Sequence, residues 1–530
     1  MSLIDSLLKS GQVSAPISGD DARVLAAELA ALGGWDGVYV PSIVAAGGVV
    51  AFLARKGREK TIGLIGEAQK AGFEGPARRV EVQGKACTLT LAPVNHGNAR
   101  ALRKLFPFTA PVTLGLKKSF GCGDRLGLAT PGHLRAIKGS GFAPILAQQS
   151  IREMTRTKRT PNEVMDCATL GAFQEGWREP FGSDADHLKN FDDVDNTVAA
   201  GFTMFTIDPG EHVDNAADTD GAEALLAKVK ALDWKTLDDT AAANEKRYVT
   251  GAAVDLGQGY SIPAVDRQAY LKAAAKYGRA VAHTVKMARH IAERKGTRPF
   301  EIEMSVDETQ AVTAPFEHFY VASELRRLGV RPVSLAPRLI GEFEKGVDYK
   351  GDLAQLEEAL QIHNAIARTV GPYKLSLHSG SDKFTVYPIF SRVCGDVLHV
   401  KTAGTSYLEA VRAVGSINPA LFRRIVKFAL ERYPTDKASY HVSADPAKVP
   451  PVDSMADVEL PSILDLFDGR QVLHVTFGSV LTTKGEDGKY LFRDEFLQAL
   501  QDDEEQHYRV LARHIGKHVA PFGRDPKSEK

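Results

Sequence analysis

Several strand-like runs in this chain end in acidic or imidazole side chains instead of apolar ones. Four runs share this ending: FGSDADH (181–187), FTMFTID (202–208), FEIEMSVDE (300–308) and KLSLHSG (374–380). In a (β/α) barrel the reactive side chains lie at the C-terminal ends of the strands, so recurrent polar endings indicate one shared mouth. The pattern therefore predicts a barrel with its functional site at that end.

Strand and helix candidates alternate regularly from Arg125 onward, as they do in parallel βα units. Four more segments complete a set of about eight strands: LGLATPGH (126–133), PILAQQS (144–150), PVSLAPR (332–338) and VLHVKTAG (397–404). QVLHVTFGSVLT (471–482) is also strand-like and is an alternative member of the set. The helices between the strands open with Thr, Ala-Pro or Asp and often close with Gly. We predict an α/β fold built on a (β/α)8 TIM-type barrel.

A length of 530 residues is too great for one core and indicates several domains. We predict an N-terminal α/β domain over 1–120, with GCGD at its end as a joining turn. The catalytic barrel is expected over 121–435 and a C-terminal extension that packs on it over 436–530. An acidic insertion at about 209–264 follows the fourth strand, and a lid, a dimer contact or a solvated decoration are the alternatives for it.

The charge balance narrows the class of partner. The 66 basic and 66 acidic residues are well mixed, so no net field attracts nucleic acid or an anionic membrane. The first residues lack the order of a signal peptide, and no apolar run is long enough to span a bilayer. We expect a cytoplasmic protein with a small-molecule partner, and a homo-oligomer is left open. The four cysteines lack CxxC spacing, so reduced thiols are expected instead of disulfides or a thiolate zinc site.

Strand alternation predicts which side chains face the barrel interior, since residues two apart share a face. The inward set of FEIEMSVDE is acidic and includes Glu303, and buried carboxylates require cations, protons or hydrogen bonds. His378 lies inward near the end of KLSLHSG. Gln148 and Arg338 also face inward, and the planar fork of Arg338 suits a carboxylate. With Lys401 of VLHVKTAG, these two are our candidates for substrate binding.

Histidines near strand ends point to a metal. Asp186 and His187 have opposite parity in an ideal strand, but both can reach the mouth where the chain turns. His187, His378 and one carboxylate would make a three-ligand site with open positions, the form of a catalytic divalent-metal site. A hydrogen-bonded core histidine is the alternative for either ring. The charged surroundings of the histidines on the last helix favour solvated side chains there: His507, His514 and His518.

Long segments with distinctive sequences are spread over about 121–520: GLATPGHLRAIKG, PILAQQSIREM, FGSDADHLKN, GFTMFTIDPGEHV, LAPRLIGEFEKGVDYKGD, KLSLHSGSDKFTVYP, VKTAGTSYLEAVR, QVLHVTFGSVLTTK and EEQHYRVLARHIGKHV. These segments resemble the tagaturonate/fructuronate epimerase family of sugar-acid catabolism. The resemblance implies a divalent-metal-dependent epimerase that interconverts D-tagaturonate and D-fructuronate.

The resemblance also implies roles for residues of this chain. Asp186 would be an acid–base residue beside the ligand His187, with Glu303 opposite and His378 as a second ligand. The metal itself is left open among Zn, Mn, Ni, Co and Fe. The third ligand is left open among four acids: Asp208, Glu303, Asp307 and Glu344.

The position of the inverted carbon, beta to the ketone, favours retro-aldol chemistry, because the ketone does not acidify a proton there. Asp186 would take the hydroxyl proton, the adjacent carbon–carbon bond would break to an enediolate stabilised by the metal, and the aldehyde would turn over before re-addition. Hydride transfer is the rival mechanism, but the chain has no dinucleotide fingerprint. Another divalent-metal sugar aldolase or ketose isomerase, or a non-catalytic barrel subunit of an aldolase, are the alternative functions.

Overall fold

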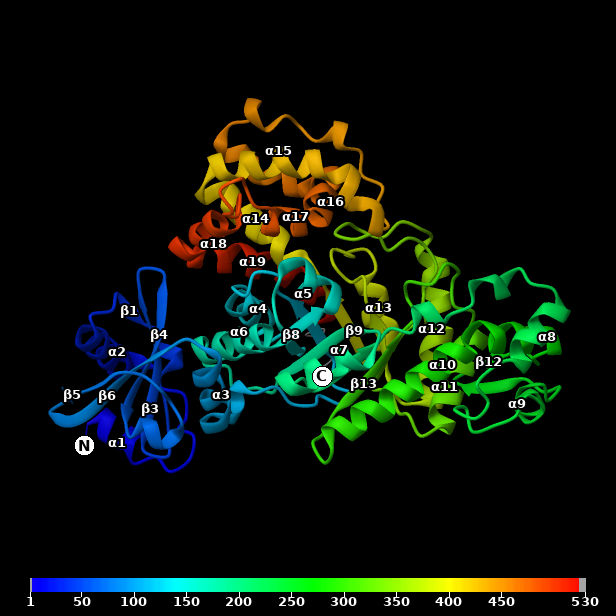
Figure 1. Cartoon of the computed structure of the whole chain (residues 1–530), viewed down its shortest axis with the longest axis horizontal. Coiled ribbons are helices and arrows are strands. Elements are labelled where there is room, and N and C mark those ends of the chain that lie inside the picture. The colour runs from blue at the N-terminus through cyan, green and yellow to red at the C-terminus, as the bar shows by residue number, and fades with distance from the viewer. Residues whose placement is uncertain (1, 524–530) are drawn as a thin grey trace, which may run out of the picture.

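The computed structural model describes residues 2–523. Figure 1 shows three regions: a blue sheet near the N-terminus, a central barrel ringed by helices, and a yellow to red helical unit above it. A green helical insertion lies on the side of the barrel opposite the blue sheet. No helix in the described range is long and apolar enough to cross a bilayer. The four cysteines are free thiols, as the sequence predicts.

The N-terminal region is a six-stranded antiparallel sheet with an apolar core on each face. Strand β3 (Val49–Lys56) sends Phe52 into a core with α2 (Gly19–Gly33) and Leu53 into a core with the barrel helix α6 (Pro161–Gln174). This second core fixes the sheet to the barrel. The other elements of the region are β1 (Gly37–Val38), β2 (Val44–Ala46), β4 (Glu59–Gly66), β5 (Ala77–Val82), β6 (Lys85–Pro93), α1 (Leu3–Leu8) and α3 (His96–Leu105).

Parallel strands form a closed barrel in which neighbours in the sequence are neighbours in space. The strands are β7 (Ser119–Gly123), β8 (Ala143–Ser150), β9 (Gly182–Leu188), β10 (Met204–Ile207), β13 (Glu301–Ser305), β14 (Ser334–Ala336), β15 (Lys374–Leu377) and β16 (Leu398–Thr402). The last strand pairs with the first, with Val400 opposite Phe120, and this pairing closes the sheet. The predicted (β/α)8 TIM-type architecture is confirmed.

Helices cover the outside of the barrel, and their starts follow the predicted capping residues. Thr160 forms a capping box at α6, and Asp352 caps α12 (Leu353–Val370). The apolar faces of these helices and the outward strand residues form the largest core of the protein. The other helices that follow barrel strands are α4 (Thr130–Ile137), α5 (Ile151–Thr157), α7 (Phe191–Ala200), α10 (Arg267–Lys295), α11 (Pro315–Arg327), α13 (Tyr387–Cys394) and α14 (Thr405–Ile417).

The first barrel strand is β7, so the predicted strand at 126–133 is wrong. Residues 126–129 of that segment form a loop, and the rest is the first turn of α4, which contains Pro131. The glycines that were expected to form a turn lie inside β7 instead. A Cβ atom on Gly123 would lie 2.6 Å from the carbonyl oxygen of Thr402. The close approach of β16 therefore requires glycine there, and the low strand propensity of glycine hides the strand in the sequence.

The segment 471–482 is helical, so the alternative barrel strand there is also wrong. It belongs to α16 (Phe467–Val475) and α17 (Phe477–Thr482). These two helices share a separate apolar core with α14, α15 (Pro419–Asp436) and α18 (Arg493–Asp502). A short apolar run in a buried helix has no clear periodicity and cannot be told from a strand.

The last helix, α19 (Glu504–Val519), packs against α4 and α14 on the outside of the barrel. The prediction of solvated histidines on it is wrong, because His507 and His518 are buried and His514 is half-buried. Nε2 of His514 lies 2.6 Å from Oδ1 of Asp382, in the loop after β15. The helix therefore completes the outer ring between the last and the first βα units, with its histidines on the inner face.

The acidic insertion packs along the side of the barrel. Its helices α8 (Ala222–Lys230) and α9 (Ala241–Tyr248) lie against α10, and its hairpin of β11 (Val254–Gly257) and β12 (Tyr260–Ile262) lies against α12 (Figure 1). The insertion begins directly after Asp208, whose Oδ2 atom lies 3.3 Å from Nδ1 of His187. A role for the insertion as a lid or a dimer contact stays a prediction.

Candidate active site

Asp186 and His187 both reach the mouth because β9 is bulged at this point. The pairing of β9 with β10 shifts by one residue between Phe205 and Ile207, so two residues of β9 lie opposite one residue of β10. His187 has a φ of 54°, in the left-handed region that residues other than glycine rarely adopt. Bulges re-aim side chains in this way beside active sites.

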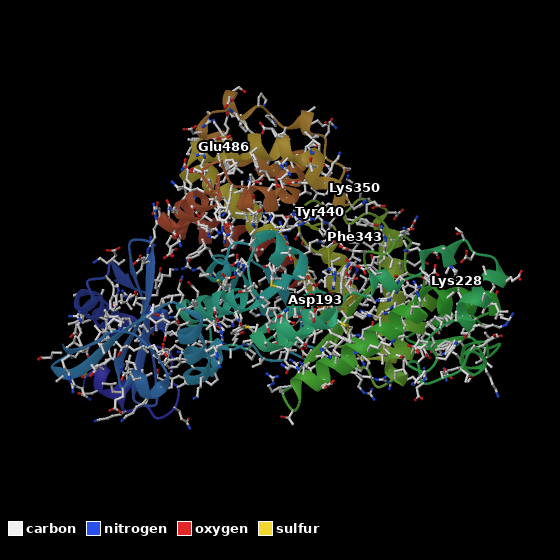
Figure 2. The ribbon with its side chains drawn as sticks, in the orientation of Figure 1. Asp193, Lys228, Phe343, Lys350, Tyr440 and Glu486 are labelled. Carbon is white, nitrogen blue, oxygen red and sulfur yellow. The ribbon has the colours of Figure 1, made fainter. Side chains whose placement is uncertain are left out.

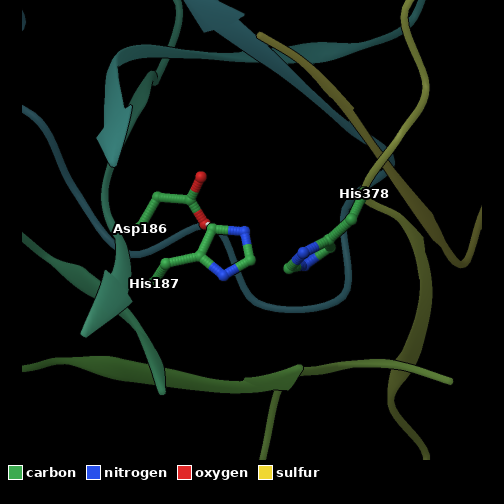
Figure 3. Close-up of side chains that lie close together, drawn as sticks. All are labelled: Asp186, His187 and His378. Atoms are coloured by element: carbon green, nitrogen blue, oxygen red, sulfur yellow. The ribbon is translucent and has the colours of Figure 1, made fainter. Parts of the chain in front are cut away.

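Asp186, His187 and His378 form a compact group at the C-terminal ends of the barrel strands. One possible ligand atom from each residue lies within 4.8 Å of the others. The rings of the two histidines lie edge to face, with centroids 5.3 Å apart and an interplanar angle of 85° (Figure 3). His378 directly follows β15, with the inward parity that alternation predicts. The structure thus brings together two strand ends that are far apart in the sequence.

Beneath this group, several buried carboxylates share the ammonium of Lys401. Its Nζ atom lies 2.8 Å from Oγ1 of Thr206. Burial disfavours the charged ammonium, but the surrounding carboxylates outweigh this effect and raise the pKa of Lys401. Lys401 is therefore a fixed positive charge that holds the acids together. Each of the following has an oxygen 2.7 Å from Nζ: Asp184, Asp186 and Glu303.

The carboxylates around Lys401 differ in their pKa values. Burial raises the pKa of Asp184 to about 6 even though Lys401 adjoins it. Burial also opposes ionisation of Asp186, but the charges of His187 and Lys401 outweigh it and lower the pKa of Asp186. A similar balance lowers the pKa of Glu303. In the metal-free protein Asp186 and Glu303 are therefore ionised at neutral pH, and Asp184 takes up a proton first as the pH falls.

His378 has an acid at each ring nitrogen. Its Nε2 atom contacts the carboxylate of Glu303, and its Nδ1 atom lies 3.4 Å from Oδ1 of Asp307. Burial and the ammonium of Lys401 favour the neutral ring. Glu303 and Asp307 outweigh both effects and raise the pKa of His378 to about 10. In the metal-free protein His378 therefore carries a proton at neutral pH.

The donor set of this site fits a divalent cation. Oδ2 of Asp208 lies 3.3 Å from Nδ1 of His187, so acids outnumber the cationic groups around the two rings. The Oε2 atom of Glu303 is buried and has no hydrogen-bond partner within residues 2–523. Two imidazoles, a carboxylate and an excess of negative charge make the type of site that holds a catalytic divalent metal.

The structure places some of the predicted candidates for a third metal ligand beside the histidines and one of them elsewhere. Glu344 lies elsewhere, because its carboxylate accepts hydrogen bonds from Ser443 and Gln471. The structure adds Asp186 as a carboxylate within ligand distance of both histidines. The remaining candidates all touch one of the two histidine rings: Asp208, Glu303 and Asp307.

The residues predicted to bind substrate lie in different surroundings. Nε2 of Gln148 donates to Asp186 at 3.1 Å, and its Oε1 atom has no partner in the described part of the chain. Lys401 donates to the acids below the site. Arg338 lines a cavity at the mouth, and its buried Nε atom has no partner in that same part of the chain. Of these three side chains, Arg338 is the one that lines this cavity.

Two cavities adjoin the histidine pair. The first, of about 230 Å³, is bordered by His378, and the second, of about 280 Å³, is bordered by His187. The first lies where the C-terminal unit meets the barrel, with Tyr440 and Phe343 on its wall (Figure 2). Its cations can bind an anionic substrate: Arg152, Arg338 and Lys345.

Several residues of the site escape sequence reasoning. Asp184 has the same parity in β9 as Asp186, so alternation was a sufficient signal for it. Thr206, which donates from Oγ1 to Asp184 at 2.7 Å, lies opposite the bulge. Arg152 and Tyr440 give no signal, because one begins a helix after its strand and the other lies in a loop far along the chain.

Comparison with known proteins identifies the family. Residues 39–522 match the model of the UxaE tagaturonate epimerase family. A tagaturonate/fructuronate epimerase from Thermotoga maritima is 42% identical over 468 residues, which are 88% of this chain and 93% of that protein. The native crystal structure of the fructuronate-tagaturonate epimerase UxaE from Cohnella laeviribosi is 38% identical, with a TM-score of 0.84 over 93% of this chain and 97% of that one. Its complex with two glycerols has a TM-score of 0.86 over 96% of this chain and 100% of that one. The chain therefore belongs to the tagaturonate epimerase family.

Proposed function

We propose that this chain interconverts D-tagaturonate and D-fructuronate, the reaction for which its relatives are named. The observation that carries the proposal is the group of Asp186, His187 and His378, with Glu303 in contact with it, at the mouth of the barrel. Family membership indicates the substrates. The group supplies both a ligand set and two carboxylates for the chemistry.

The reaction must invert a carbon beta to the ketone, where direct deprotonation is unfavourable. Cleavage of the bond between that carbon and its neighbour nearer the ketone removes the stereocentre. The bonding electrons pass to the ketone fragment as an enediolate, and the other fragment becomes an aldehyde. Re-addition to the opposite face of the aldehyde restores the centre with inverted configuration. A divalent ion held by His187, His378 and a neighbouring carboxylate would supply positive charge that stabilises anionic oxygen.

Asp186 and Glu303 are the proposed acid–base pair. Asp186 is ionised in the metal-free protein and can accept the hydroxyl proton of one stereoisomer. Oε1 of Glu303 is held by His378 and Lys401, whereas Oε2 has no partner within residues 2–523. We therefore assign the proton of the opposite direction to Oε2. Each group acts as a base in one direction and as an acid in the other.

The substrate carboxylate is assigned to Arg338, whose planar fork can donate two parallel hydrogen bonds. The free Oε1 atom of Gln148 is placed to accept a bond from a substrate hydroxyl. Lys401 was predicted to bind substrate, but it lies 2.7 Å from Asp186 and from Glu303, so we assign it to positioning these acids. A cytoplasmic location and a homo-oligomeric state stay predictions.

Turnover of tagaturonate by metal-stripped and metal-restored protein tests the proposal. We expect fructuronate to form only after metal is restored, as followed by chromatography or NMR. A panel of neutral ketoses run in parallel separates the alternatives. Turnover of ketoses without turnover of hexuronates would indicate another sugar aldolase or isomerase. Failure to retain metal, with no turnover of either class, would indicate a non-catalytic barrel subunit.

A further inference from the structure

We propose that Arg152 and Glu308 form a gate between the two cavities, and that Arg152 leaves Glu308 to bind the substrate carboxylate together with Arg338. This inference rests on the proposed function, because it takes the substrate to be a sugar acid. It adds a specificity residue, an orientation for the substrate and a conformational step on binding.

The position of the pair suggests the gate. Arg152 lies at the start of α5, directly after β8, and Glu308 lies just beyond β13. Both residues line the first cavity and both line the second. His378 borders the first cavity and His187 borders the second. Arg152 and Glu308 therefore lie between the two cavities, as the two histidines do. A six-carbon chain that reaches into both cavities would therefore lie against this pair.

The ion pair between Arg152 and Glu308 is weak enough to separate. The Arg152 Nη2 atom lies 3.4 Å from Oε1 of Glu308, and the two side chains are 38% and 47% exposed. Exposed pairs of this length contribute little to stability, because water and side-chain entropy offset the attraction. Substrate binding can therefore separate the two side chains at little energetic cost.

Glu308 occupies the place that a substrate carboxylate would need. Its Oε1 atom also lies 3.9 Å from Nζ of Lys345, which in turn donates to Oγ of Ser379 at 2.9 Å. One protein carboxylate thus lies between two cations of the first cavity. The ring of Tyr440 supports Arg152, with the guanidinium carbon 5.6 Å from the ring centroid. We infer that Glu308 is an internal substitute for the substrate carboxylate in the free enzyme.

Charge gives the substrate an orientation. The first cavity carries three cations, Arg152, Arg338 and Lys345, against three acids, and the Nε atom of Arg338 has no hydrogen-bond partner among the described residues. The second cavity carries Asp193 and Asp208, and its Lys189 is already paired with a surface glutamate at 2.9 Å. The carboxylate end of the substrate therefore belongs in the first cavity, and the uncharged hydroxymethyl end belongs toward the second.

Binding of D-glycerate and glycerol tests the gate without turnover. D-glycerate is a stable analogue of the three-carbon acid released by cleavage, and glycerol has the same skeleton without the carboxylate. In the wild-type protein we expect D-glycerate to bind more tightly than glycerol in an NMR or calorimetric titration. Arg152→Gln should weaken D-glycerate about 10- to 100-fold, the usual worth of a hydrogen bond to a charged group, and leave glycerol unchanged. Glu308→Gln should strengthen D-glycerate, because it removes the competing carboxylate.

Lys189→Gln is the matched control, because it removes one cation from the second cavity only. We expect it to leave the ratio of D-glycerate to glycerol affinity unchanged. An Arg152→Gln variant with the wild-type ratio would overturn the gate, as would one that weakens both ligands equally. A wild-type protein that prefers D-glycerate but converts no tagaturonate would leave the gate standing and overturn the proposed reaction, so the two failures are distinguishable.

Discussion

The rings of His187 and His378 lie 5.3 Å apart, centroid to centroid, although one belongs to β9 and the other follows β15 on a different part of the barrel wall. Asp186 lies within ligand distance of both rings. Two imidazoles and a carboxylate at this spacing suit a shared divalent ion, which we propose that they hold. Removal of either histidine is therefore expected to abolish the shared metal site.

Replacing either His187 or His378 by Ala should remove the metal and the epimerase activity together. Bound metal per protein, measured by elemental analysis after gel filtration, should fall from about one to near zero, because a catalytic site has few protein ligands. His290→Ala is the control, since His290 pairs with Asp195 on the outer helices. Full metal content in both the His187 and the His378 variants would contradict the assignment.

Metal affinity should rise with pH. In the metal-free protein the pKa of His378 is raised to about 10 from an ordinary value of 6.5. Its proton therefore stabilises the folded metal-free protein below pH 6.5, and this stabilisation is lost as the pH rises through about 10. Metal must displace the same proton, so the apparent Kd should fall at least about tenfold per pH unit between pH 7 and 9. A Kd that does not change over this range would show that His378 is not a ligand.

Amide variants of the acid–base pair should lose turnover more than substrate binding. We expect Asp186→Asn and Glu303→Gln each to lower kcat about 100-fold or more while KM changes little, because a positioned proton donor or acceptor acts mainly in the transition state. Metal content must be measured in the same samples. If either variant loses its metal, the corresponding carboxylate is a ligand and its assignment as acid–base residue is wrong.

The two sides of this site differ in how well they follow from the sequence. Glu303 lies on a regular strand and His378 directly follows one, so alternation alone gives their inward direction. Asp186 and His187 both reach the mouth because β9 is bulged against β10, and no local sequence pattern in β9 predicts this bulge. Arg152 and Tyr440 meet at a cavity formed by regions that are distant in the chain. Only the folded packing of the C-terminal unit on the barrel brings them together.

The fold shows the same division between local and long-range causes. Seven of the predicted strands have clear alternation or turn boundaries and were placed correctly. The glycine-rich β7 was missed, because glycine has a low strand propensity. Its glycine at 123 is required by the close approach of the β16 backbone. The histidines of α19 were taken for solvated side chains, because burial of that helix depends on α4 and α14.

Lys401→Met should destabilise the barrel and disturb the acids. The variant leaves Asp184, Asp186 and Glu303 buried without their shared cation, and breaking a buried ion pair in this way costs about 3–5 kcal/mol. Lys374→Met is the control: Lys374 is equally buried in the barrel, but its Nζ atom donates to Oγ of Ser119. Urea unfolding of both variants gives the comparison. An equal loss of unfolding free energy in the two would mean that the carboxylates do not depend on Lys401.

The central claim is that this chain epimerises a hexuronate by breaking a carbon–carbon bond at the group around Asp186 and His378. The direct measurement is conversion of tagaturonate by the metal-loaded protein in heavy water, with the product analysed by NMR and mass spectrometry. Retro-aldol epimerisation keeps the hydrogen on the inverted carbon, so we predict fructuronate without deuterium at that position. Deuterium on the inverted carbon would show direct deprotonation and would contradict the account, and so would the absence of fructuronate.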